Sequence, residues 1–116
     1  MKKELTEYHN IHLIGIGGAS MYAIAAMLKN DGKIVTGSDM QESDNTKYLE
    51  SIGISVKIGH DSEVVKNADL VIYTAAISED DPELVCAKNH GIECVERAIF
   101  LGEYTKQYEN LTCISG

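Results

Sequence analysis

LIGIGGASM, residues 13–21, is an apolar run that breaks into three glycines and then resumes as a segment rich in alanine and methionine. The pattern is typical of a strand that turns sharply into a helix around a phosphate. Gly15 would permit the tight turn, Gly17 would let a phosphate approach the backbone, and the helix that begins near Gly18 would direct its unpaired N–H groups at that phosphate. A glycine turn that serves packing alone is the alternative. The stretch therefore predicts an α/β fold with a nucleotide site, without indicating which nucleotide binds.

A second recurring pattern also favours an α/β fold. Three times, a helix-like segment ends in a glycine, and a short β-branched run follows: NDGKIVTGSD (30–39), SIGISVKIGHD (51–61) and NHGIECVE (89–96). Glycine just past a helix adopts the left-handed conformation without a steric penalty, and β-branched residues suit a buried strand. Together with NIHLIGI (10–16) and ADLVIYTAA (68–76), these runs predict five strands.

Helices are expected between the strands. The predicted ranges are 18–30, 44–52, 82–90 and 97–107, with a weaker turn near 62–67, and LTCIS (111–115) is a possible sixth strand. Asp81 followed by Pro82 marks the start of the helix near 82. Strands that alternate with helices favour parallel pairing with right-handed crossovers. We therefore expect a Rossmann-like, doubly wound, mostly parallel five-stranded sheet with helices on both faces, and a ligand across the carboxyl ends of the strands.

Composition limits the partners. The 116 residues fit one domain, and the formal charge of −8 argues against nucleic acid or an anionic membrane, because either would need a basic face. The sequence shows neither a signal peptide nor a run of about 20 apolar residues, so we expect a cytoplasmic protein. The three cysteines lack CxxC spacing, and we expect reduced thiols rather than zinc ligands or disulfides at Cys86, Cys94 and Cys113. The oligomeric state is not indicated.

Polar residues follow the predicted strands at the edge where a ligand would bind. Asp39 lies about 20 residues beyond the glycine loop, where such folds place an acid on ribose hydroxyls, although a helix cap or a solvated loop would also suit it. His60 follows the next strand and would stack on a base or donate to it. Ser78 would either bind a phosphate or cap the next helix. Surface or packing roles are assigned to the remaining histidines, His9, His12 and His90.

The sequence contains no catalytic constellation. It has no paired carboxylates in a defined site, no nucleophile at a known spacing from a base, and no complete phosphate loop of the GxxxxGK[ST] type. We therefore expect a binding module without catalytic or metal-ligating residues.

Four segments together resemble the amino-terminal domain of the bacterial Mur ligase family: IHLIGIGGASM (11–21), VTGSDMQESDNTKYLESIGISVKIGHD (35–61), ADLVIYTAAISEDDPELVCAKNHGIECVERAIFLGE (68–103) and CISG (113–116). The resemblance implies an N-terminal tail over 1–9, a Rossmann-like domain over 10–110 that binds a UDP-sugar, and the start of a central ATPase domain over 111–116. Gly116 matches the first glycine of the ATP-binding loop of that central domain. We therefore expect the chain to be a piece of a longer protein.

The resemblance also implies a ligand. It is closest to family members that use ATP and Mg²⁺ to join L-alanine to UDP-N-acetylmuramate in peptidoglycan synthesis, and their amino-terminal domain holds the uridine diphosphate. ATP and Mg²⁺ act in the other domains, so this piece is expected to need no cofactor and to be inactive alone. The implied contacts are Gly15, Gly17, Gly18, Ala19, Ser20 and Met21 at the diphosphate, Asp39 and His60 near ribose and uracil, and Ala75, Ala76, Ile77 and Ser78 along the wall.

Some features stay open at this point. Ser20 stands where many members have glycine, and Arg97 matches a family arginine that would face the sugar-nucleotide or form a surface salt bridge. A related ligase that attaches recycled murein peptide to the same UDP-sugar is one alternative, and an NAD-binding regulatory module is another. IGHD (58–61), TAAIS (74–78) and DDPEL (80–84) favour a ligase, because a plain dinucleotide sensor does not need them.

Overall fold

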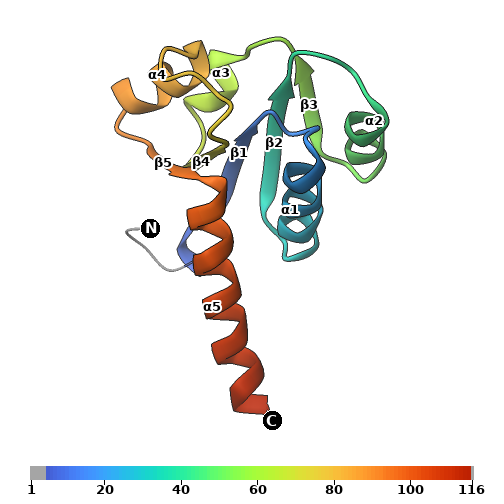
Figure 1. The fold of residues 1–116 in the computed structure, drawn as a ribbon, viewed down its shortest axis with the longest axis vertical. Coiled ribbons are helices and arrows are strands. Elements are labelled where there is room, and N and C mark those ends of the chain that lie inside the picture. Colours follow the sequence, from blue (N-terminus) through green and yellow to red (C-terminus); the bar gives the residue numbers. More distant parts are fainter. Residues whose placement is uncertain (1–4, 116) are drawn as a thin grey trace.

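The protein is built around a parallel sheet of five strands with helices on both faces (Figure 1). The structure, a computed structural model, describes residues 5–115 and, among these, the side chains of residues 6–106. The strands lie in the order β3-β2-β1-β4-β5, where β1 is Asn10–Ile14, β2 Ile34–Asp39, β3 Ser55–Ile58, β4 Leu70–Tyr73 and β5 Glu93–Glu96. The helices are α1 (Ala19–Asn30), α2 (Asp44–Ser51), α3 (Ser62–Val65), α4 (Pro82–Asn89) and α5 (Arg97–Ser115), and a 3₁₀ turn spans Leu5–Glu7. All four strand pairings are parallel, which confirms the predicted fold class.

The two faces of the sheet carry separate apolar clusters. In β4, Leu70 and Ile72 pack with α1, α2 and α5, whereas Val71 between them packs with α3 and α4. This alternation follows from the period of two along a strand. It also sends His12 of β1 to the same face as Ile14, the face that α3 and α4 cover.

The three predicted helix-to-strand junctions are confirmed. Their glycines have positive φ: 88° at Gly32, 95° at Gly53 and 70° at Gly91. The N–H of the residue after each glycine donates back to a carbonyl in the last turn of the helix, as in Lys33 to Leu28 at 3.1 Å. Asp81 caps α4 with Pro82 at its first position, also as predicted.

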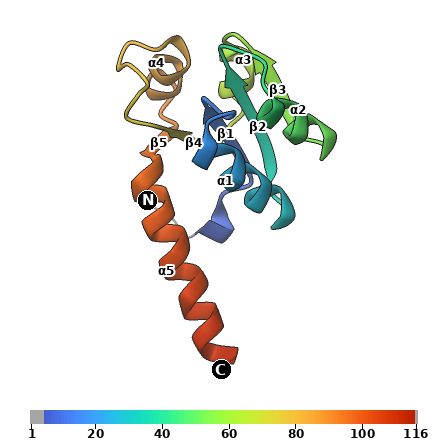
Figure 2. The ribbon, with the colours of Figure 1, turned by 45° about the vertical axis from the view of Figure 1, so that its right-hand side comes forward.

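The segment 111–115 is part of α5, so the expectation of a sixth strand there is wrong. A strand needs a neighbour to satisfy its backbone groups, whereas a helix satisfies them internally. Figures 1 and 2 show α5 leading away from the sheet, where no strand of the described chain is available for pairing. The predicted domain boundary at 110/111 falls inside α5 and stays a prediction, and Gly116 lies outside the described residues. Tyr8, in the predicted tail, is buried in the core.

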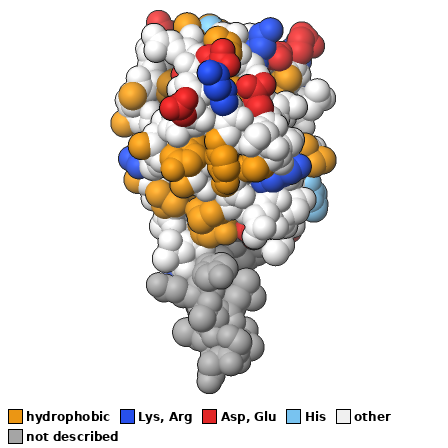
Figure 3. All heavy atoms as spheres, turned by 90° about the vertical axis from the view of Figure 1, so that its right-hand side faces the viewer, with side chains coloured by type: hydrophobic (Ala, Val, Ile, Leu, Met, Phe, Trp, Pro, Cys, Tyr) orange, Lys and Arg blue, Asp and Glu red, His pale blue; other side chains and the backbone are white. Residues whose placement is uncertain are grey.

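Edge strand β3 and helix α2 form one side of the molecule. Figure 3 shows this side, on which hydrophobic side chains form a band next to a cluster of charged ones. Exposed hydrophobic residues on these two elements include Tyr48 and Ile58. The exposed Lys57 on β3 disfavours further strand pairing at this edge. Among the described helices, none has the length and apolar character to span a bilayer.

Candidate functional site

The carboxyl ends of the strands lie at the top of Figure 1. A hollow of 120 Å³ is lined by residues at the ends of these strands and in the loops that follow them. The sheet order places β2 on one side of β1 and β4 on the other, so the loops after β1 and β4 diverge here, at the position where parallel α/β sheets bind ligands. Four predicted site residues line the hollow, namely Gly15, Asp39, His60 and Ile77. The other lining residues are Ile14, Ser38, Met40, Gly59 and Asp81.

The glycine loop lies against the end of β2. Gly15 has a φ of 77°, which confirms that it makes the turn off β1. The N–H groups of Gly15 and Ile16 both donate to the Ser38 carbonyl, at 2.8 and 2.9 Å. The Gly17 N–H donates to Asp39 Oδ2 at 2.9 Å, and the Gly17 carbonyl accepts from Asn45 Nδ2 at 2.9 Å. The protein itself therefore fixes the path of this loop.

Gly17 is required for packing. A Cβ at this position would lie 2.8 Å from Asp39 Oδ2 and 2.9 Å from Thr46 Cγ2. The packing alternative therefore applies to this glycine, and its contact with a phosphate stays a prediction. A similar requirement, which the sequence interpretation missed, exists at Gly37 in β2, where a Cβ would lie 2.2 Å from Ile16 Cδ1 and 2.6 Å from Ile16 Cβ.

The N-terminus of α1 opens beside this loop. Gly18 occupies the N-cap position, and no side chain caps the helix there. The first hydrogen bond of the helix runs from the Tyr22 N–H to the Gly18 carbonyl, at 3.0 Å. The N–H groups of the three preceding residues, Ala19, Ser20 and Met21, are those that helix geometry leaves without an intrahelical acceptor. An anion at this end would meet both these donors and the positive end of the helix dipole.

Arg97 connects the start of α5 to the start of α1. Its Nη1 donates to Ser20 Oγ at 2.8 Å, and its Nε is buried without a hydrogen-bond partner in the described structure. Two residues 77 positions apart are thus joined beside the uncapped helix end. This arrangement places a guanidinium next to the predicted diphosphate site, and Arg97 does not form the alternative surface salt bridge within the described residues.

The loop after β4 contributes one wall. Ile77 lines the hollow, whereas Ala75, Ala76 and Ser78 are exposed and are not among the lining side chains. Ser78 hydroxyl donates to the carboxylate of Asp80, and the cap of α4 is Asp81, so Ser78 does not cap that helix.

Glu83, a residue that sequence reasoning did not select, is fully buried and bonds two residues that line the hollow, Ser38 and His60. Its carboxylate accepts from His12 Nε2 at 2.5 Å, from Ser38 Oγ at 2.7 and 2.8 Å, and from His60 Nδ1 at 3.1 Å. Burial opposes ionisation, but the hydrogen bonds from His12 and Ser38, the nearby His12 charge and the bond from His60 together hold the pKa of Glu83 below its ordinary value. Glu83 is therefore a carboxylate that only accepts hydrogen bonds.

His12 is part of this buried network. It is 1% exposed and also contacts Thr36 Oγ1 through Nδ1 at 2.9 Å. The burial of His12 is consistent with the packing role that the sequence predicted. In addition, its ring forms a hydrogen bond with Glu83, the carboxylate that also bonds His60. A histidine inside the apolar run NIHLIGI (10–16) is a signal that a buried polar partner exists, because unpaired buried polar groups are costly. The identity of that partner, 71 residues away, could not be read from spacing.

Three side chains could hold a divalent cation. His60 Nδ1 and carboxylate oxygens of Asp81 and Glu83 lie within 4.8 Å of one another. Both Glu83 oxygens, however, already accept hydrogen bonds from within the protein. We therefore assign the group to hydrogen bonding rather than to metal binding.

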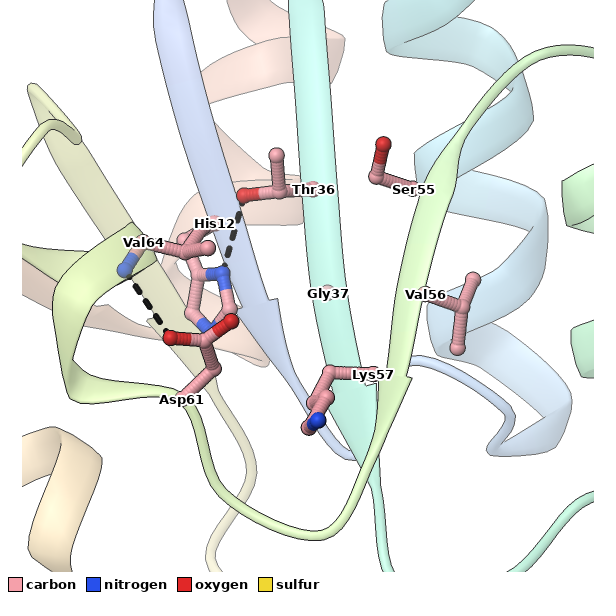
Figure 4. A pocket seen from close by; sticks show the side chains of 8 residues that line it. All are labelled: His12, Thr36, Gly37, Ser55, Val56, Lys57, Asp61 and Val64. Atoms are coloured by element: carbon pink, nitrogen blue, oxygen red, sulfur yellow. Dashed lines mark hydrogen bonds between the residues drawn. The ribbon is translucent and has the colours of Figure 1, made fainter.

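A second hollow, of 160 Å³, lies on the sheet face between β2, β3 and α3 (Figure 4). Figure 4 shows the His12–Thr36 hydrogen bond on one wall and the Asp61 cap of α3 next to it. None of the predicted ligand-binding residues lines it. The hollow at the carboxyl ends of the strands is therefore the better candidate site.

Comparison of the sequence with known proteins identifies one family. Residues 10–109 match the Mur ligase family, catalytic domain. A relative from Caldicellulosiruptor saccharolyticus, named UDP-N-acetylmuramate–L-alanine ligase, is 57% identical over 104 residues, which are 90% of this chain and 23% of that protein. The chain thus spans less than a quarter of the length of such relatives.

Solved structures give the same result. The crystal structure of UDP-N-acetylmuramate–alanine ligase from Thermotoga maritima has a TM-score of 0.82 and 33% identity, covering 87% of this chain and 23% of that one. A murein peptide ligase from Psychrobacter arcticus has a TM-score of 0.68 and 25% identity, covering 74% of this chain and 18% of that one.

Proposed function

Because the chain belongs to the Mur ligase family, we propose that it is the domain that holds the uridine-diphosphate part of UDP-N-acetylmuramate in an ATP-dependent ligase that adds L-alanine during peptidoglycan synthesis. The observation that carries this proposal is the uncapped N-terminus of α1, which opens beside the hollow at the carboxyl ends of β1 and β4. Such a helix end binds phosphate through backbone donors, which an acidic protein can do without a basic surface.

Each part of the ligand has a matching part of the site. The diphosphate would accept hydrogen bonds from the N–H groups of the first turn of α1, with the Arg97 guanidinium next to them. Asp39 Oδ2 accepts from the Gly17 N–H and Asp39 Oδ1 from the Gln41 N–H, so each oxygen retains a lone pair for a ribose hydroxyl. Met40 and Ile77 would provide apolar walls for the base, and His60 its polar contact.

The chemical step belongs elsewhere in the proposed enzyme. A carboxylate is a poor electrophile, so amide formation needs ATP to convert it into an acyl phosphate, with Mg²⁺ and a lysine stabilising the transferred charge. This chain has no GxxxxGK[ST] loop. We propose that ATP, Mg²⁺ and phosphoryl transfer are handled by segments that the longer relatives possess, in the cytoplasm, and that this piece alone binds without catalysing.

Calorimetric titration of the chain with UDP, UDP-N-acetylmuramate and NADH tests the proposal. Saturable binding of the uridine nucleotides without binding of NADH is expected. Binding of NADH alone would support the regulatory module instead and would refute the proposal. The murein-peptide ligase alternative predicts the same titration, because both enzymes use the same UDP-sugar. An assay of the longer protein with L-alanine or with murein peptide as the amine separates these two.

A further inference from the structure

Glu83 is the centre of a buried hydrogen-bond network. This side chain is 0% exposed, and its carboxylate accepts from His12, Ser38 and His60. An ionised carboxylate has no proton to donate, so each of these partners must supply the hydrogen. The nitrogen of His60 that faces Glu83, Nδ1 at 3.1 Å, therefore carries the proton in that bond.

The other ring nitrogen of His60 has a different role. In a neutral imidazole only one nitrogen carries hydrogen, so a proton on Nδ1 leaves Nε2 as an acceptor. Nε2 has no hydrogen-bond partner among the residues that the structure describes, and the ring is 36% exposed and lines the hollow. The other nearby carboxylate, Asp81 Oδ2, lies 4.0 Å from Nδ1, beyond hydrogen-bond distance.

Packing alone does not require the bond between His60 and Glu83. His12 and Ser38 are 1% and 2% exposed, and each needs a buried acceptor. His60 is partly exposed, so water could satisfy it. Glu83 already accepts hydrogen bonds from His12 and Ser38 and does not need a third donor. The bond from His60 is therefore the part of the network that indicates a role in the candidate site.

We propose that Glu83 is a positioning residue that holds His60 in the Nδ1–H tautomer, so that Nε2 accepts a hydrogen bond from a donor of the nucleoside, either the uracil N3–H or a ribose hydroxyl. The inference rests on the proposed function and adds a basis for its specificity. A site that presents an acceptor binds a nucleoside without the matching donor more weakly, because the acceptor then gives up its hydrogen bond to water and gains none in return.

The tautomer can be measured without a ligand. In the chain labelled with ¹⁵N, two-bond correlations from the ring protons of His60 distinguish a protonated from an unprotonated nitrogen. At pH 8 the expected result is a protonated Nδ1 and an unprotonated Nε2. An Nε2–H tautomer or a doubly protonated ring would overturn the proposal. His9, whose exposed ring makes no hydrogen bond within the described residues, provides the internal reference.

Ligand analogues test the role of Nε2. Wild-type chain is titrated with UDP, 3-methyl-UDP, 2′-deoxy-UDP and 3′-deoxy-UDP. Removal of the donor that pairs with Nε2 is expected to weaken binding about tenfold, the size of one hydrogen bond. Loss of a hydroxyl held by Asp39 would weaken binding too, so the donor to Nε2 is the one whose removal costs less in Glu83→Gln than in the wild type. In Glu83→Gln the amide no longer enforces one tautomer, so UDP binding is expected to weaken about tenfold while the penalty for that analogue shrinks.

The control is Glu63→Gln, a change of the same kind at an exposed residue of α3 that pairs with Lys66, and UDP binding is expected to be unchanged. A wild-type chain that binds UDP and all three analogues equally would overturn this inference and leave the proposed function intact. If UDP does not bind at all, both fail. The ¹H–¹⁵N NMR spectrum of the backbone shows whether Glu83→Gln is folded. If this variant is unfolded, the tautomer measured in the wild type still tests the inference.

Discussion

Replacement of Glu83 by alanine is expected to destabilise the fold strongly. The change removes the acceptor for His12 Nε2 at 2.5 Å and for Ser38 Oγ at 2.7 Å, and both donors are buried. An unsatisfied buried donor costs about 1–3 kcal/mol, so the two together cost roughly 2–6 kcal/mol. His60 adds little to this cost because water can reach it. A total of this size is a large fraction of the 5–15 kcal/mol that is typical for a domain.

The assay is urea unfolding followed by circular dichroism, since the chain has no tryptophan. Glu63→Ala is the matched control, because Glu63 is exposed and its ion pair with Lys66 lies on the surface of α3. We expect this control to change the free energy of unfolding by less than about 0.5 kcal/mol.

A double variant sharpens the test. In Glu83→Ala, Ser38 keeps a buried hydroxyl without an acceptor, so adding Ser38→Ala removes one unsatisfied donor. Glu83→Ala/Ser38→Ala is therefore expected to be more stable than Glu83→Ala alone, by about 1 kcal/mol. The reasoning is refuted if Glu83→Ala costs less than about 1 kcal/mol, or if the second change lowers stability further.

Three further predictions concern pH, packing and ligand binding. The pKa of Glu83 is lowered on folding, so its contribution to stability is present above its ordinary value of 4.5 and is lost as the pH falls through the lower pKa of the folded state. In urea unfolding, the difference in free energy of unfolding between wild type and Glu83→Gln should therefore shrink as the pH falls below 4.5. Gly37→Ala should lower the free energy of unfolding by about 1–3 kcal/mol, because its Cβ would lie 2.6 Å from the Cβ of buried Ile16. Gly102→Ala in α5, where a Cβ meets nothing within 4 Å, should raise it by about 0.5–1 kcal/mol. Thermal unfolding measures both variants, and equal effects would contradict the packing argument. Arg97→Met keeps the aliphatic stem but removes the guanidinium beside α1, so UDP titration should show binding weakened about fivefold, and unchanged binding would exclude Arg97 from the diphosphate site.

Local sequence signals predicted most of the fold correctly. Gly32, Gly53 and Gly91 end helices in the predicted way because the left-handed conformation is a property of single residues. The segment 111–115 was predicted wrongly because β-branched composition reports what a residue tolerates, and not whether a neighbouring strand exists.

The candidate site was only partly predictable for a related reason. Gly15, Asp39 and His60 follow strands, and parallel strands bring their carboxyl ends to one edge, so their meeting could be expected. The bond between Glu83 and His12 depends on the packing of α4 over β1, and the Arg97–Ser20 contact depends on α5 meeting α1. No spacing rule relates residues on elements that meet only in the folded chain.

Ser38 explains why the two halves of the site are held in one geometry. Its carbonyl accepts the N–H groups of Gly15 and Ile16, which fixes the loop that leads to the uncapped end of α1. Its hydroxyl donates to Glu83, which in turn accepts from His60, the residue proposed to contact the nucleoside. Because Ser38 is 2% exposed and lies in a central strand, neither contact can move without disturbing the sheet. The proposed phosphate side and the proposed nucleoside side are therefore positioned by the same buried residue before a ligand arrives, which would lower the cost of ordering the site on binding.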